Sequence, residues 1–173
     1  DYSTISDITI TAGSTTGTAS FTPTDDNVYE GNETGIVAID TVSGGSANES
    51  NTPQVVTITI TENESAPTVT LATSATSIAE NAGSSLTLTA TLSVATTANV
   101  TVSLDGTGGT GTEGTDFGTV SDITITAGST TGTTSFTPTD DSIYDATSNE
   151  TAGISISVSY THLRAHETKK HLV

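Results

Sequence analysis

Carboxylates are the side chains that could do ionic chemistry over most of this chain. The sequence has 20 acidic residues, and all of them except Glu167 lie within residues 1–160. The basic residues Arg164, Lys169 and Lys170 all follow Tyr160, as do the histidines. No cationic side chain is therefore available to pair with the carboxylates of residues 1–160. Their chemistry is that of oxygen ligands for a hard cation, or of paired acids.

Composition excludes several other kinds of chemistry. The chain has no cysteine, so it has neither disulfides nor thiol nucleophiles, and zinc and copper are poor candidates for a metal. Nothing in residues 1–160 neutralises phosphate, which excludes a nucleic-acid partner. There is no run of about 18 apolar residues, so we expect no insertion into a membrane. Paired carboxylates cleave glycosides in some enzymes, but the aromatic platforms of sugar sites are nearly absent. We predict no enzyme.

A long internal repeat defines the organisation of the chain. Asp1–Tyr29 reappears as Asp116–Tyr144 with six differences, and the Asn-Glu-Thr of residues 32–34 reappears at residues 149–151. A spacing of about 115 residues is too long for a solenoid repeat and suits a small domain. The sequence therefore predicts a tandem array of similar domains.

Alternating apolar and hydroxyl residues predict short, half-buried strands. Leu86–Leu92 and Ile154–Val158 place apolar side chains on one face and Thr or Ser on the other. Such strands, separated by Gly, Asn and Asp clusters, favour an all-β, immunoglobulin-like antiparallel sandwich. The expected strands are residues 4–11, 17–23, 34–42 and 54–61 in the first domain, and 68–72, 85–93, 99–104, 120–126, 131–138 and 151–159 in the second. The Gly-rich stretch Gly106–Gly111 fits a dinucleotide-binding pattern but has no helix after it, so we expect a loop.

The predicted boundary between the domains lies near Ala66-Pro67. Residues 1–65 then supply strands D to G of a first domain, and residues 66–159 supply strands A to F of a second domain without its strand G. Residues 160–173 are basic and lose the Thr/Ser pattern. They are either a genuine C-terminal segment or, as we favour, a sequence similar to translated vector or adapter, outside the domain.

The acidic residues gather in the connections at one pole of the predicted sandwich. Successive connections alternate between two poles, and those at the other pole carry almost no acid. In the second domain the acidic pole holds Glu80, Asp105, Glu113, Asp116, Asp140, Asp141, Asp145 and Glu150. In the first domain it holds Asp1, Asp25, Asp26, Glu30, Glu33, Glu62 and Glu64.

Two explanations fit this concentration of acidic residues at one pole. Several carboxylates close together repel one another, and calcium relieves this repulsion by taking roughly six to eight oxygen ligands in flexible geometry. Alternatively, the acids only solubilise the loops and form Asx turns. The segregation favours calcium.

Three short motifs carry a resemblance to the Calx-beta family. Ser77–Gly83 resembles the family's S-x-x-E-x-x-G segment, and Gly114–Phe117 resembles its Gly-x-Asp-Tyr motif, of which Asp1-Tyr2 is the end. Asp140-Asp141 with Asp145 and Glu150 resembles its D-D-x-x-x-E-x-x-E stretch, as do Asp25-Asp26 with Glu30 and Glu33. The resemblance to the family extends over about residues 1–159.

The resemblance implies a fold, a ligand set and a role. The family fold is an immunoglobulin-like sandwich that binds calcium through its loops. The implied ligands are Glu80, Asp116, Asp140, Asp141, Asp145 and Glu150 in the second domain, and Asp1, Asp25, Asp26, Glu30, Glu33, Glu62 and Glu64 in the first. We expect a calcium-stiffened spacer or adhesion segment of a large secreted or surface protein, bacterial in origin, whose partners are neighbouring repeat domains. The alternatives are a calcium-independent module that binds a cell-surface glycan or protein, and an accessory domain of a secreted hydrolase.

Overall fold

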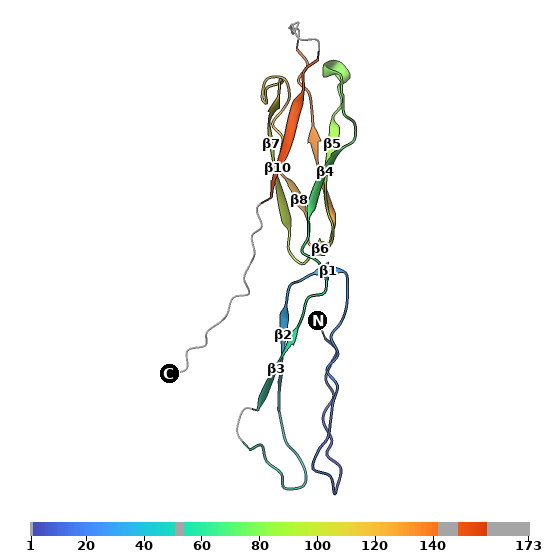
Figure 1. Ribbon diagram of the computed structural model, residues 1–173, viewed down its shortest axis with the longest axis vertical. Helices are drawn as coiled ribbons and strands as arrows, with labels where there is room; N and C mark the ends of the chain where they lie inside the picture. Colours follow the sequence, from blue (N-terminus) through green and yellow to red (C-terminus); the bar gives the residue numbers. More distant parts are fainter. Residues whose placement is uncertain (1, 51–53, 142–148, 159–173) are drawn as a thin grey trace, which may run out of the picture. The chain divides into compact units, whose positions relative to one another are not determined.

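The computed structural model describes residues 2–50, 54–141 and 149–158, and their regular secondary structure is almost entirely β (Figure 1). One short 3-10 turn, η1 (Glu80–Ala82), is the only helical element among them. No helix in this part of the chain is long and apolar enough to cross a membrane. The chain divides into two compact units, Asp1–Ala66 (unit 1) and Pro67–Val173 (unit 2).

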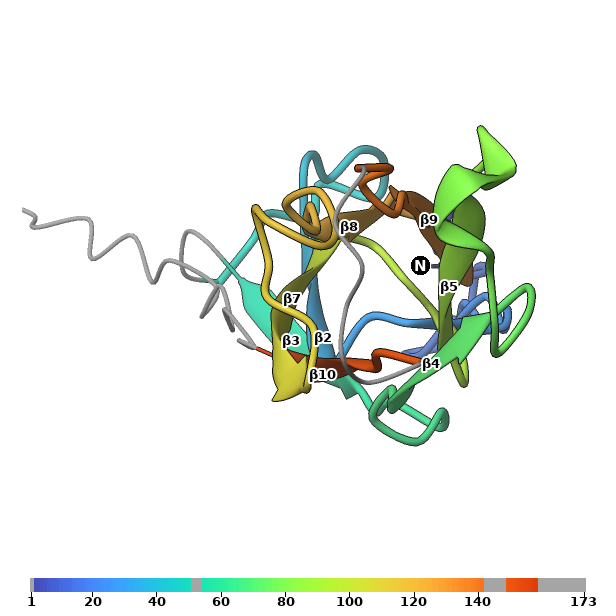
Figure 2. The ribbon, with the colours of Figure 1, turned by 90° about the horizontal axis from the view of Figure 1, so that it is seen from above.

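Unit 2 is a sandwich of two antiparallel, three-stranded sheets. One sheet has the strand order β4-β5-β9 and the other the order β10-β7-β8. Figure 2 looks along the strands and shows the two sheets facing each other. The strands are β4 (Val69–Thr73), β5 (Leu86–Leu92), β6 (Ala95–Thr96), β7 (Val100–Gly109), β8 (Ile123–Ile125), β9 (Thr131–Phe136) and β10 (Ala152–Val158). The predicted all-β sandwich is confirmed.

The core of unit 2 follows from the alternation in its strands. Leu88 and Leu92 of β5, Val102 of β7, and Ile123 and Ile125 of β8 are all buried. The register Val102↔Ile123 and Val100↔Ile125 places these side chains together between the sheets. The intervening threonines lie on the outer faces, so each strand separates its apolar residues from its hydroxyls.

Unit 1 holds a single hairpin-like pair of strands. Its strands are β1 (Val28–Tyr29), β2 (Glu33–Ala38) and β3 (Val55–Ile60). Strands β2 and β3 pair antiparallel, from Glu33↔Ile60 to Ala38↔Val55. The strands expected over residues 4–11 and 17–23 do not form, which corrects the prediction: these segments run as coil (Figure 1, dark blue).

The repeated sequence shows why those strands are missing. In unit 2 the same residues form β8 and β9, which pair with β7 and β5 and not with each other. Among the described residues of unit 1, no strand corresponds to β5 or β7. Ile8 and Ile10 are each 57% exposed, whereas the equivalent Ile123 and Ile125 are 0% and 1% exposed. An isolated strand has no ladder hydrogen bonds to stabilise it.

Strand β7 is longer than expected and corrects two predictions. It continues through Gly109, so Asp105 lies within a strand, and Gly106–Gly109 are not a loop. Gly108 and Gly109 pair with Gly153 and Ala152 of β10. A Cβ on Gly153 would lie 2.7 Å from the backbone of Gly108. The glycines therefore permit a close approach of two strands, which their composition alone does not reveal.

Candidate metal centre

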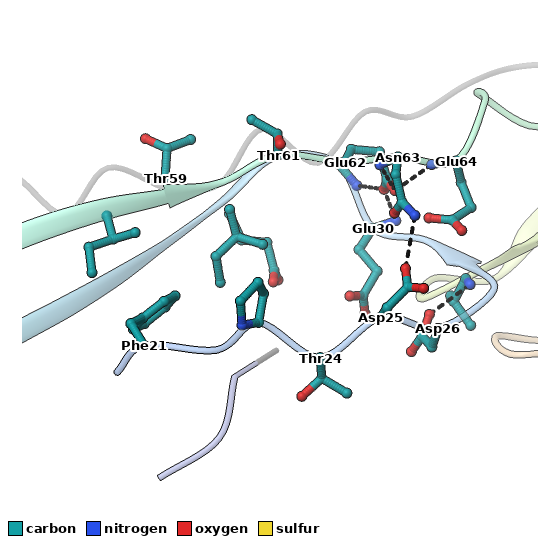
Figure 3. A pocket seen from close by; sticks show the side chains of 16 residues that line it. Phe21, Thr24, Asp25, Asp26, Glu30, Thr59, Thr61, Glu62, Asn63 and Glu64 are labelled. Atoms are coloured by element: carbon teal, nitrogen blue, oxygen red, sulfur yellow. Dashed lines mark hydrogen bonds between the residues drawn. The ribbon is translucent and has the colours of Figure 1, made fainter. Parts of the chain in front are cut away.

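Acidic residues of unit 1 surround one hollow of about 370 Å³ (Figure 3). The β2–β3 register pairs Glu33 with Ile60, so the residues that follow β3 lie beside the turn that precedes β2. The carboxylates that line this hollow are Asp25, Asp26, Glu30, Glu33, Glu62 and Glu64. All six come from the set implied by the family resemblance. We call this cavity, with the six carboxylates that line it, the unit 1 acidic hollow.

Glu62 is the organising residue of this hollow. Its Oε2 accepts hydrogen bonds from the backbone N–H groups of Glu30 and Gly31, each at 2.6 Å. Its Oε1 accepts from the N–H groups of Asn63 and Glu64, each at 3.0 Å. One carboxylate thus ties the segment after β3 to the turn before β2. Gly31 has a positive φ of 81°, a conformation that glycine adopts without strain.

Two asparagines complete this arrangement, and the sequence did not single them out as site residues. Oδ1 of Asn32 accepts from the N–H of Glu62 at 2.9 Å. Nδ2 of Asn63 donates to Oδ1 of Asp25 at 2.8 Å (Figure 3). Asp26 accepts from the N–H of Val28 at 2.8 Å, which is an Asx turn. The recurrence of Asn-Glu-Thr in both domains is the sequence signal for Asn32.

The carboxylates of the hollow perturb one another. Backbone hydrogen bonds hold the pKa of Glu62 at about 2, below its usual 4.5, because they stabilise the charged form. Partial burial, followed by the charges of Glu33 and Asp26, raises the pKa of Glu30. Hydrogen bonding to Glu62, then partial burial and nearby carboxylates, raises the pKa of Glu64. The hollow is a site of negative potential with no cation among the described residues.

These shifts predict a pH dependence of the local structure. Because the pKa of Glu62 is lowered on folding from 4.5 to about 2, its stabilising effect is present above pH 4.5. That effect is lost as the pH falls from 4.5 through about 2. Glu30 and Glu64 act in the opposite sense, since a raised pKa favours the folded state while the carboxyl is protonated. We expect the amide NMR signal of Gly31 to titrate with a midpoint near pH 2. A midpoint near 4.5 would show that Glu62 is not held by these amides.

The acidic residues of unit 2 are less closely gathered. Glu80, Asp116 and Glu150 line a second hollow, and the N–H of Asp141 donates to Oε1 of Glu80 at 3.2 Å. Asp140 precedes Asp141 and is exposed. Oδ2 of Asp116 accepts from the N–H of Thr112 at 2.6 Å, which closes its own loop. The hydrogen bond from Asp141 links Glu80, at the start of η1, to the segment after β9.

The calcium ligand set stays a prediction. Asp1 and Asp145 lie outside the described residues. Within the residues that are described, no group of three or more Asp, Glu or His side chains is arranged to hold a metal ion. Four of the carboxylates that line the hollows, those of Asp26, Glu62, Glu80 and Asp116, accept hydrogen bonds from backbone amides. They have the chemistry of calcium ligands, and several would have to turn towards a common ion to bind it.

Comparison with known proteins gives one family. The family model of the Calx-beta domain matches residues 1–64 and, a second time, residues 62–171. The two matches confirm the tandem repeat, and the second includes most of the segment 160–173. No curated protein and no solved structure matches the chain. Calx-beta domains form a non-catalytic family of repeat modules, typically found in extracellular or membrane proteins.

Proposed function

Because the chain belongs to the Calx-beta domain family, we propose that it is a calcium-binding module of a large secreted or surface protein, bacterial in origin. Its role is that of a spacer or adhesion segment whose neighbouring domains are held at a fixed angle by calcium. The observation that carries this proposal is the unit 1 acidic hollow. Six carboxylates line it, and residues 1–160 contain no basic side chain to neutralise them.

The physical basis of the proposal is the cost of gathering these charges. Partial burial and then the charges of Glu33 and Asp26 raise the pKa of Glu30, and hydrogen bonding to Glu62, then partial burial and nearby carboxylates raise the pKa of Glu64. Repulsion between like charges is therefore part of the cost of ionising these two groups. A divalent cation in the hollow reverses that effect. Calcium suits the site because it accepts carboxylate, carbonyl and water oxygens at flexible angles.

The position of the hollow in the sequence suggests how calcium would stiffen an array. Glu62 and Glu64 belong to the segment that leads from β3 to Pro67, where the next unit begins. A cation held by both this segment and the turn before β2 would restrain the linker. Without the cation, repulsion between Glu30, Glu62 and Glu64 would loosen it.

Calcium titration of the 173-residue chain by calorimetry, with parallel thermal melts, tests the proposal. We expect saturable heat and a melting temperature that rises with calcium, because a ligand that binds only the folded state stabilises it. Magnesium at the same concentration is the control for non-specific screening, since it demands a tighter octahedral site. Absence of heat and of any shift at millimolar calcium would mean that the carboxylates only solubilise the loops.

Small-angle scattering tests the mechanical part separately. We expect the chain to have a longer and better defined maximum dimension with calcium than with a chelator. If calcium binds but the two scattering profiles are identical, the module is a calcium-binding domain that does not act as a stiffened spacer.

A further inference from the structure

The carboxylate of Glu62 is saturated with hydrogen bonds from the protein itself. An ionised carboxylate has about four lone-pair sites, shared between its two oxygens. In Glu62 the backbone N–H groups of Glu30 and Gly31 donate to Oε2, each at 2.6 Å. Those of Asn63 and Glu64 donate to Oε1, each at 3.0 Å. The donors therefore occupy both oxygens of Glu62, and a cation could bind this carboxylate only by displacing them.

Two neighbouring carboxylates of the hollow are bonded differently (Figure 3). Oδ1 of Asp25 accepts from Nδ2 of Asn63 at 2.8 Å, and Oδ1 of Asp26 accepts from the N–H of Val28 at 2.8 Å. In each case the other oxygen, Oδ2, takes no part in that bond. Calcium binds carboxylate oxygens one or two at a time. Asp25 and Asp26 can therefore offer an oxygen to an ion and keep the hydrogen bonds that they accept.

We propose that Glu62 is the positioning residue of the unit 1 acidic hollow and not one of its calcium ligands. Its carboxylate holds the turn before β2 and the segment after β3 together before any metal binds. The ion is then bound by the carboxylates that this arrangement positions, among them Asp25, Asp26, Glu30 and Glu64. This differs from the ligand set implied by the family resemblance. The first half of the proposal stands without calcium, and the second half rests on the function proposed above.

The path of the backbone shows how one side chain can hold both segments. The β2–β3 ladder reaches the pair Glu33↔Ile60, so the segment after β3 passes directly beside the turn before β2. Oδ1 of Asn32 accepts from the N–H of Glu62 at 2.9 Å, which fixes the backbone of Glu62 itself. Gly31 has a φ of 81°, and a Cβ there would meet no atom within 4 Å. Glycine is therefore required by the backbone conformation that directs its N–H to Glu62, and not by lack of space.

The hydrogen bonds of Glu62 and the repulsion between carboxylates act in opposite directions on the linker. Hydrogen bonds to a charged acceptor are stronger than those between neutral groups, and they hold the segment that leads to Pro67. The charges of Glu30 and Glu64 each repel that of Glu62. Calcium removes the repulsion and leaves the hydrogen bonds in place. The linker is therefore partly ordered without calcium and fully ordered with it.

Amide hydrogen exchange of the 173-residue chain in the presence of a chelator tests the first half. We expect the N–H groups of Glu30, Gly31 and Glu64 to be protected, and Glu62→Gln to speed their exchange by about tenfold or more, as loss of hydrogen bonds to a charged group predicts. A glutamine has one acceptor oxygen, so one pair of donors then faces its NH2 group. Glu33→Gln is the matched control, because it removes the same charge from the same hollow and Glu33 accepts none of these bonds. Amide signals of β2 and β3 report that unit 1 is still folded.

Addition of calcium then distinguishes a positioning residue from a ligand. If Glu62 positions the site, the N–H groups of Glu30 and Gly31 keep their protection when calcium saturates the chain, because the carboxylate stays with its donors. A ligand has to turn towards the ion and release them, so loss of this protection on adding calcium would overturn the proposal. Gly31→Ala removes no charge but disfavours the positive φ that directs its N–H to Glu62. We expect it to weaken calcium binding by about tenfold, as changes in residues that support a metal site do.

The remaining outcomes separate the anchoring role from the function on which the ligand assignment rests. Equal exchange rates for the unsubstituted chain and Glu62→Gln in chelator would show that these bonds do not hold the turn, and would overturn the first half. Calcium affinity unchanged by Gly31→Ala would show that Glu62 contributes only its charge, and would overturn the second half. Protection that Glu62→Gln abolishes, in a chain that gives no heat with calcium, would confirm the anchor and overturn both the ligand assignment and the proposed function.

Discussion

Replacing Ile125 by alanine is expected to lower the free energy of unfolding of unit 2 by about 2–5 kcal/mol, as large-to-small changes in cores do. Ile125 is 1% exposed and packs between the sheets with Val102 and Leu92. Its repeat equivalent Ile10 has the same neighbours in sequence but is 57% exposed. Ile10→Ala should therefore change stability by less than about 0.5 kcal/mol.

Urea denaturation followed by amide NMR signals of β7 for Ile125→Ala, and of β2 for Ile10→Ala, measures this difference in the unit concerned. The two substitutions remove the same atoms from the same local sequence, so each is the control for the other. Equal losses of stability from Ile125→Ala and Ile10→Ala would mean that residues 8–10 are covered in solution.

The same pair of residues shows what local sequence determines and what it does not. The turn between the two segments is identical in both units: the N–H of Ser14 donates to the carbonyl of Thr11 at 2.9 Å, as Ser129 does to Thr126. The strands on either side of this turn form only in unit 2. Alternation of apolar and polar residues thus identified segments that can form a strand. Whether the strand forms depends on a neighbouring strand to pair with, and the alternation carries no information about that neighbour.

The error over Gly106–Gly109 has a different origin. Glycines are common in loops, and the pattern of this stretch gave no apolar alternation. These glycines lie in β7, where Gly108 faces Gly153 at a distance that leaves no room for a side chain. Such a contact joins residues far apart in sequence, so it cannot be inferred from either stretch alone.

The sequence predicted which carboxylates of unit 1 lie near one another, but not the hydrogen bonds that they accept. The alternation of connections between two poles of the sandwich placed Asp25, Glu30 and Glu62 near one another, and the structure brings them to one hollow. That alternation could not show that Glu62 would accept four backbone hydrogen bonds. The donors depend on the local path of the backbone in the turn before β2 and in the segment after β3. The alternation also gave no role to Asn32 or Asn63, since neutral amides carry no charge pattern.

Substitution of Asp25 and Asp26 by asparagine is expected to weaken calcium binding at unit 1 by about 10–100-fold, the range seen when a residue supporting a metal site is lost. Both hydrogen bonds that these residues accept, from Asn63 and Val28, are available to an asparagine oxygen. Asp25→Asn/Asp26→Asn therefore removes two charges while it leaves the turn in place. A change in affinity then reports the charge that calcium requires, because ligand charge sets the affinity of calcium sites.

Two matched double variants separate the site from the overall charge of the chain. Asp7→Asn/Asp40→Asn removes the same two charges from positions outside the hollow, and should leave calcium affinity within about twofold, because exposed charges at a distance are screened by salt. Asp140→Asn/Asp141→Asn changes the repeat equivalents of Asp25 and Asp26 in unit 2. Calorimetry of the three variants assigns each binding event to a unit.

If all three weaken binding equally, calcium is attracted by the net charge of −17 and not by a built site. If only Asp25→Asn/Asp26→Asn weakens it, the ligands lie in the unit 1 acidic hollow, and the turn before β2 and the segment after β3 together hold the ion.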